Sequence, residues 1–127
     1  MYKTILVNQM IEDGATLLNR LDERGIPVSA AAWFDDPEKQ SWKLVFVTSV
    51  AQNPGPLEAY LQIQKAMGGL TTSIALDDII VMGPSSGKFQ EFRRTMEGAA
   101  RGEFLHPKPP SVGVALDDAY VYRWLVK

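Results

Sequence analysis

Two apolar runs joined by a short polar segment constrain the fold of this chain more than any other feature. The runs "VSAAAWF" (residues 28–34) and "WKLVFVTSV" (42–50) are rich in β-branched and aromatic side chains, whereas "DDPEKQS" (35–41) consists of turn-forming and charged residues. We therefore expect a β-hairpin, which makes the two strands antiparallel neighbours. A connection of this length predicts Trp33 roughly opposite Trp42, as an aromatic cross-strand pair.

Three further segments have the periodicity of amphipathic helices, with apolar residues recurring at steps of three and four. The first covers residues 8–24, the second lies within residues 53–69, and the third begins at Ser85 or Ser86 and ends at Gly102. Each starts near a serine, an asparagine or a glycine that can act as N-cap, and each stops at glycine. These capping residues make the helix ends predictable.

The remaining apolar runs complete a mixed set of elements. The run "IIVMG" (79–83) is continuous and predicts a buried strand, and "VGVAL" (112–116) with "AYVYRWLV" (119–126) predicts a second hairpin that turns at Asp117 and Asp118. The order is then α-β-β-α-β-α-β-β. We expect a single α+β domain over residues 1–127, a two-layer sandwich in which three helices cover a mixed, mostly antiparallel sheet of about five strands.

Composition limits the available chemistry. The chain has 127 residues, no cysteine, one histidine and a formal net charge of −2. The lack of cysteine excludes disulfides, thiolate nucleophiles and cysteine-ligated metal sites, and we interpret His106, beside prolines, as a surface loop residue. Net negative charge disfavours nucleic-acid binding, and no apolar run approaches the ~20 residues that span a bilayer. We expect a cytoplasmic protein without a cofactor that binds neither membrane nor nucleic acid.

The segment "MGPSSGKF" (82–89) has the layout of a phosphate-binding loop, because it joins a predicted strand to a predicted helix. It departs from the nucleotide-binding motif: Gly83 and Gly87 enclose three residues, and Phe89 stands where a serine or threonine would hold magnesium. An NTPase is therefore not expected. A simpler anion or phosphate site at Ser85, Ser86, Gly87 and Lys88 is one interpretation, and an ordinary strand-to-helix turn with a serine cap is the other.

The tetrapeptide "ALDD" occurs twice and sets Asp77 and Asp78, then Asp117 and Asp118, before apolar runs. If both copies began neighbouring strands at one edge of the sheet, the four carboxylates would converge, as a metal-dependent hydrolase of phosphate esters or nucleic acid requires. The alternative is local, because aspartate is a turn former and adjacent strand residues point to opposite faces. We favour the local interpretation, in which the first copy enters a strand and the second turns a hairpin.

The last predicted strand is aromatic. Strand alternation predicts Tyr120, Tyr122 and Trp124 on one face and Arg123 on the other. If the strand lies at an edge of the sheet, the aromatics form either a core face or an interface. We expect core packing, with a homodimer contact as the functional alternative.

The succession of the helix "NQMIEDGATLLNRLDER", the segment "GIPV", an Ala-rich strand with Trp, the turn "DPE" and the closing "DDAYVYRW" resembles a group of small bacterial proteins. No activity is assigned to that group, so the resemblance implies a bacterial cytosolic origin and carries over no functional residue. The favoured function is a non-enzymatic binding or protein-interaction domain that forms a homo-oligomer or binds a protein partner. The metal-dependent hydrolase is the alternative.

Overall fold

Helices and strands follow one another along the chain in the predicted order. The structure is a computed structural model whose described residues are 8–36, 41–70, 74–100, 114–116 and 119–125. Its main elements are α1 (Asn8–Glu23), β1 (Ala30–Asp36), β2 (Ser41–Val47), α2 (Pro56–Met67), β3 (Ile79–Met82), α3 (Gly87–Ala100), β4 (Val114–Leu116) and β5 (Ala119–Trp124), with short 3₁₀ turns at Ser49–Ala51 and Leu76–Asp78. The α+β class is confirmed.

The strands form one mixed sheet in the order β3-β2-β1-β5-β4. Strand β1 is antiparallel to both β2 and β5, and β4 is antiparallel to β5, so both predicted hairpins are present. Strands β2 and β3 are parallel, with α2 as the crossover between them. A parallel pair needs a crossover of this kind because a tight turn can join only antiparallel strands.

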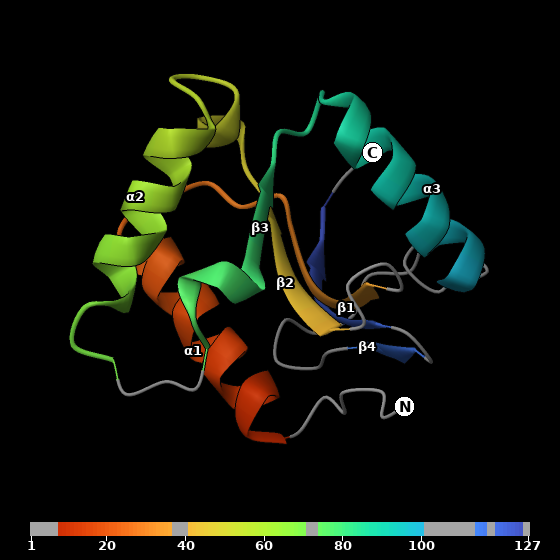
Figure 1. The fold of residues 1–127 in the computed structure, drawn as a ribbon, viewed down its shortest axis with the longest axis horizontal. Helices are drawn as coiled ribbons and strands as arrows, with labels where there is room; N and C mark the ends of the chain where they lie inside the picture. Colours follow the sequence, from red (N-terminus) through yellow and green to blue (C-terminus); the bar gives the residue numbers. More distant parts are fainter. Residues whose placement is uncertain (1–7, 37–40, 71–73, 101–113, 117–118, 126–127) are drawn as a thin grey trace.

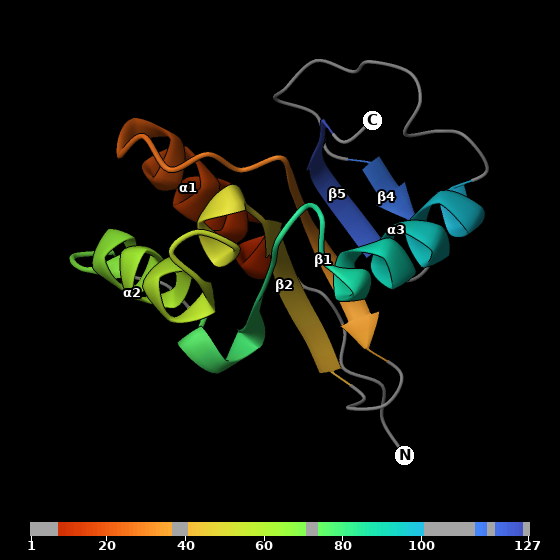
Figure 2. The same ribbon diagram turned by 90° about the horizontal axis from the view of Figure 1, so that it is seen from above.

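The prediction that all three helices cover one face of the sheet is wrong. Helices α1 and α2 pack on one face and α3 packs on the other, which gives three layers (Figures 1 and 2). The cause lies in β2, where Leu44 and Phe46 belong to the core under α1 and α2, while Val45 and Val47 belong to the core under α3. A strand with apolar side chains on both faces must be covered on both faces.

The two cores differ in size. The α1/α2 core contains Leu17, Leu21, Trp33, Trp42, Leu44, Phe46 and Ile63 among its buried residues. The α3 core is smaller and consists of Ala30, Ala32, Val45, Val47, Met82, Phe89, Phe92 and Val121. Full burial of each large side chain contributes about 1.5–3 kcal/mol, so the α1/α2 core contributes more to stability. None of the described helices combines the length and the apolar character that crossing a membrane requires.

The register of the first hairpin differs from the predicted one by two residues. Trp33 pairs with Leu44, and Trp42 pairs with Asp35. The strands extend through Asp36 and Ser41, so the connection is shorter than the polar segment suggested. Because a shift of two residues keeps each side chain on its face, both tryptophans still lie in the α1/α2 core.

A β-bulge in β5 changes the expected distribution of its side chains. Ala31 pairs with Arg123 and Ala32 with Val121, so Tyr122 is the extra residue. A bulge interrupts strict alternation: Tyr122 and Arg123 both contact the α1 side, whereas Trp124 packs against α3. The prediction that Tyr120, Tyr122 and Trp124 share one face is therefore wrong.

The Tyr122 hydroxyl joins three elements in the α1/α2 core. It donates to the Ile11 carbonyl oxygen of α1 at 2.6 Å and accepts from Trp33 Nε1 of β1 at 2.9 Å. Burial raises the pKa of this hydroxyl above its usual value, so the group remains a hydrogen-bond donor. Gly14 lies against the side chains of Tyr122 and Trp33, and a Cβ at this position would collide with the Tyr122 hydroxyl.

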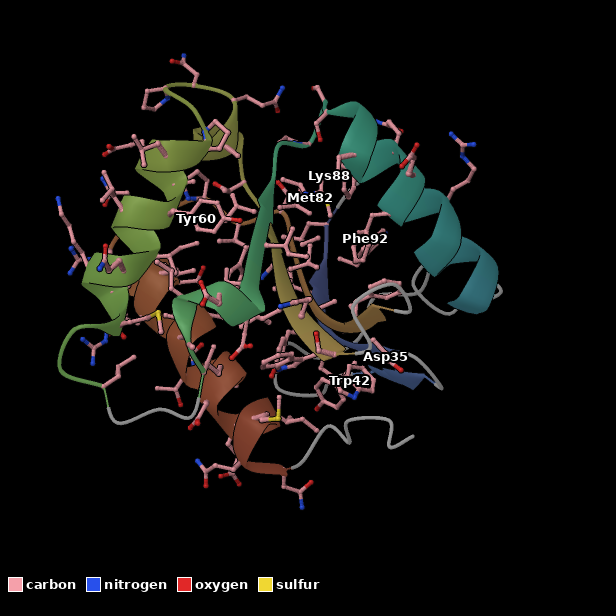
Figure 3. The ribbon with its side chains drawn as sticks, viewed as in Figure 1. Asp35, Trp42, Tyr60, Met82, Lys88 and Phe92 are labelled. Atoms are coloured by element: carbon pink, nitrogen blue, oxygen red, sulfur yellow. The ribbon has the colours of Figure 1, made fainter. Side chains whose placement is uncertain are left out.

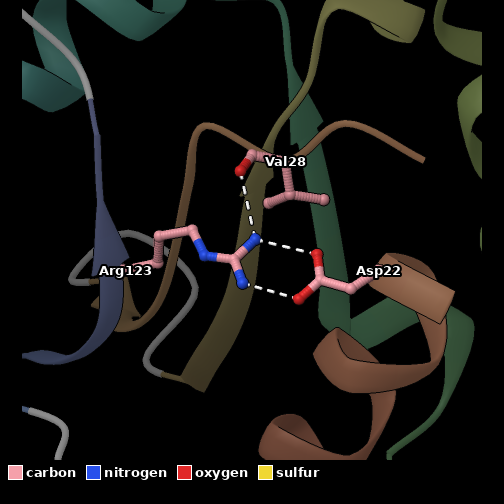
Figure 4. A network of polar contacts seen from close by, with 3 residues as sticks. All are labelled: Asp22, Val28 and Arg123. Atoms are coloured by element: carbon pink, nitrogen blue, oxygen red, sulfur yellow. Dashed lines mark hydrogen bonds and ion pairs between the residues drawn. The ribbon is translucent and has the colours of Figure 1, made fainter. Parts of the chain in front are cut away.

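Arg123 ties β5 to the end of α1 (Figure 4). Its guanidinium donates to both carboxylate oxygens of Asp22, at 2.9 and 2.6 Å, and to the Val28 carbonyl oxygen at 3.3 Å. The two parallel hydrogen bonds fix the geometry of the pair. They hold the pKa of the Asp22 carboxyl below its usual value of 3.8.

The free edge of β3 is covered by a side chain of α2. The Tyr60 hydroxyl donates to the Ile79 carbonyl oxygen at 3.3 Å and accepts from the Val81 N–H at 3.2 Å (Figure 3). These two backbone groups point away from β2 and would otherwise be available to another strand. Tyr60 therefore blocks strand addition at this edge.

We expect Gly14→Ala to lower the free energy of unfolding by about 1–3 kcal/mol, because the added methyl group overpacks the Tyr122 site. The helix propensity of alanine offsets at most about 1 kcal/mol of this loss. Urea denaturation measures the change. In the Tyr122→Phe background the same substitution should cost less, and a neutral Gly14→Ala variant would contradict the packing described for Tyr122.

Removal of the Asp22–Arg123 pair should destabilise the protein only where Asp22 is ionised. Asp22→Asn should cost about 1 kcal/mol at pH 7, a modest value because the pair is partly exposed. The pKa is lowered in the folded state, so the stabilisation is complete well above pH 3.8 and is lost as the pH falls below that value. Urea denaturation at pH 7 and at pH 3 tests this, and an equal loss at both pH values would contradict it.

Candidate anion-binding site at the ends of β2 and β3

The carboxyl ends of β2 and β3 lie side by side, and the connections that leave them go to opposite faces of the sheet. The two strands are parallel neighbours, yet the helix that follows β2 covers one face and the helix that follows β3 covers the other (Figure 1). Both helices begin at this end of the sheet. In open α/β sheets such a switch point is the usual position of a ligand site.

The turn from β3 into α3 is organised by Ser86. Its Oγ donates to the Gly83 carbonyl oxygen at 2.9 Å and accepts from the Phe89 N–H at 3.1 Å. Ser86 is therefore the N-cap of α3, which the sequence predicted with Ser85 as the other choice. Because its hydroxyl already binds two backbone groups, Ser86 positions the turn.

Gln52 connects the loop after β2 to the turn after β3. Its Oε1 accepts from the Ser85 N–H at 3.1 Å, and its side chain fills the space where a Cβ of residue 83 would stand. A neutral amide oxygen thus already occupies one backbone donor of the turn. A side chain at position 83 would displace Gln52 from this position.

Further backbone donors stand at the start of α3. The N–H groups of Gly87 and Lys88 belong to the first turn of α3, where no intrahelical acceptor exists. The Lys88 side chain is exposed beside them (Figure 3). Together with the positive end of the helix dipole, these groups favour an anion. The structure therefore brings together the four predicted anion-site residues Ser85, Ser86, Gly87 and Lys88, with Gln52 beside them.

The first acidic pair, Asp77 and Asp78, makes hydrogen bonds that stabilise the turn before β3. Asp78 Oδ2 accepts from the Ala75 N–H at 3.0 Å, and the Asp77 carbonyl oxygen accepts from Lys43 Nζ at 3.0 Å. Both aspartates lie in the 3₁₀ turn Leu76–Asp78 that enters β3. The first copy of "ALDD" is thus a strand-entry turn, as the local interpretation has it.

The two copies do not begin neighbouring strands. Asp117 and Asp118 lie outside the described residues, but they connect Leu116 of β4 to Ala119 of β5, which pair directly. Strand β3 is at one edge of the sheet and this hairpin is at the other. Three strand spacings separate β3 from β5, roughly 14 Å, whereas paired catalytic metals lie about 4 Å apart. Within the described ranges, no three His, Cys, Asp or Glu side chains gather as metal ligands would.

The predicted interface residues lie on an internal strand. Strand β5 is hydrogen-bonded to β1 on one side and to β4 on the other. Tyr120 stacks edge-on against Tyr122, with ring centroids 5.2 Å apart, and Trp124 contacts Phe89 and Phe92 of α3. These side chains and Arg123 are thus engaged within the protein. His106 lies outside the described residues.

Sequence reasoning missed Gln52 and the switch point itself. The signal was present: two continuous apolar runs, residues 44–47 and 79–82, flank an amphipathic helix, which is the pattern of a β-α-β unit with parallel strands. Gln52 carries no such signal. Its role depends on the spatial neighbourhood of two loops that are about thirty residues apart in the chain.

We expect Gly83→Ala to destabilise the protein by about 1–2 kcal/mol, because the new methyl group meets the Gln52 side chain. In the Gln52→Ala background the added cost should fall below about 0.5 kcal/mol, since the space is then empty. Urea denaturation of the four proteins in this cycle gives both values. Equal costs in the two backgrounds would show that Gln52 does not fill this position.

No family model, curated protein or solved structure matches the chain.

Proposed function

We propose that this protein is a small binding domain that recognises an anionic group, such as a phosphate, at the N-terminus of α3. The observation that carries the proposal is the switch point, where the turn at residues 83–88 lies between two helix N-termini on opposite faces of the sheet. The first-turn N–H groups of α3 and the Lys88 ammonium supply hydrogen-bond donors and positive charge. An anion oxygen can also replace Gln52 Oε1 on the Ser85 N–H.

Binding is a better description of this end of the sheet than catalysis. Ser86 Oγ is engaged with the backbone on both sides, and the other groups of the turn are backbone donors, the Ser85 hydroxyl and an exposed lysine. These groups can hold an anion in place, and a reaction would require a nucleophile or general base beside it. A bacterial cytoplasmic setting, with a homo-oligomer or a protein partner, belongs to the same proposal.

The test is a titration with inorganic phosphate followed by amide chemical shifts. We expect the amide signals of Ser85, Gly87 and Lys88 to move in a saturable manner, and added salt to weaken the effect. Lys88→Ala should raise the Kd about fivefold, because one surface charge contributes about 1 kcal/mol.

Lys65→Ala is the matched control, because Lys65 is exposed in the last turn of α2 and not at the helix start. This variant should bind phosphate as the wild type does. Amide shifts that are absent from residues 85–88, or a Kd that Lys88→Ala leaves unchanged, would overturn the anion site.

A further inference from the structure

The outer face of α2 exposes large apolar side chains to solvent. Leu57 is 74% exposed and Leu61 is 41% exposed. They stand one helical turn apart on one stripe of α2, whereas Ala59, Ile63 and Ala66 face the core. Helix α2 lies at the outside of the α1/α2 layer, and its inner side faces β3 and α1 (Figure 2). The third exposed large apolar side chain of the described residues, Leu125 at 69%, follows β5 elsewhere in the fold.

Two charges of opposite sign lie along one side of this stripe, in a self-complementary arrangement. Glu58 precedes Leu61 by three residues and Lys65 follows it by four. At about 100° per residue, both fall on the same side of Leu61, at about 60° and 40° around the helix. A second copy of α2 that runs antiparallel, with a twofold axis beside Leu61, therefore sets Glu58 opposite Lys65 of the partner subunit. The symmetry repeats this pair on the other half of the contact.

We propose that the protein self-associates through α2, as an antiparallel helix pair centred on Leu61. In this pair Leu61 packs against its own copy, Leu57 packs beside it, and the two Glu58–Lys65 pairs set the direction of the helices. The contact is small compared with a stable dimer interface, so the association is weak and depends on concentration. The proposal is independent of the anion site, which lies at the start of α3.

Two other surfaces that could support self-association are engaged within the described structure. The Tyr60 hydroxyl covers the edge of β3, and the aromatic residues of β5 pack within the sheet and against α3. A partner that recognised only an apolar patch would need no matched charges. The position of Glu58 and Lys65 about Leu61 therefore favours a second copy of this chain over an unrelated protein.

Sedimentation equilibrium of the whole protein, from about 1 µM to about 1 mM, tests the contact. We expect the average mass to rise toward twice that of the single chain. Leu61→Glu should weaken the association at least about tenfold, because it buries two like charges at the centre. Leu125→Glu is the matched control and should associate as the wild type does. A wild type that stays monomeric throughout, or equal effects of the two substitutions, would overturn the proposal.

Charge reversal tests the direction of the helices separately. Glu58→Lys and Lys65→Glu should each weaken the association several-fold at low salt, and the double variant should regain it, because the reversed pairs are again opposite in sign. Thermal melting confirms that each variant is folded. Failure of the double variant to recover, with both single variants impaired, would overturn the antiparallel arrangement.

Discussion

The burial of β2 on both faces is the constraint on which the rest of the structure depends. Leu44 and Phe46 point toward α1 and α2, and Val45 and Val47 point toward α3, and all four are at most 1% exposed. Burial of each of these side chains stabilises the folded state by about 1.5–3 kcal/mol. Helices must therefore cover both sides of the sheet. The chain meets this requirement by sending α2 to one face and α3 to the other.

This division of the helices determines which loops and strand ends lie near one another. The crossover α2 allows β3 to run parallel to β2, so that two helix N-termini and two loops lie at one end of the sheet. It also places β3 at one edge and the β4–β5 hairpin at the other. The same arrangement therefore favours an anion site at the start of α3 and keeps the two "ALDD" segments apart.

Hydrogen bonds from tyrosine and arginine side chains complete the assembly in places that backbone pairing does not reach. Tyr122 links α1, β1 and β5 within the larger core, and Arg123 binds the last turn of α1. Both side chains face α1 because of the bulge in β5. Tyr60 performs a similar role at the β3 edge. All three side chains are thus engaged inside the described part of the fold.

The sequence by itself determined the elements and their local ends. Ser86 caps α3, Pro56 begins α2 after Gly55, and two turn-rich segments place both hairpins, because caps and turns depend on the φ and ψ preferences of a few adjacent residues. Only the tertiary structure decided the three layers, the register of Trp33 and the face of Trp124. These features depend on which distant side chains share a core. The apolar residues of a strand that is buried on both faces do not indicate which helix will pack against each face. The contact of Gln52 with the turn at Gly83 and Ser85 is of the same kind, since it exists only where two loops meet in space.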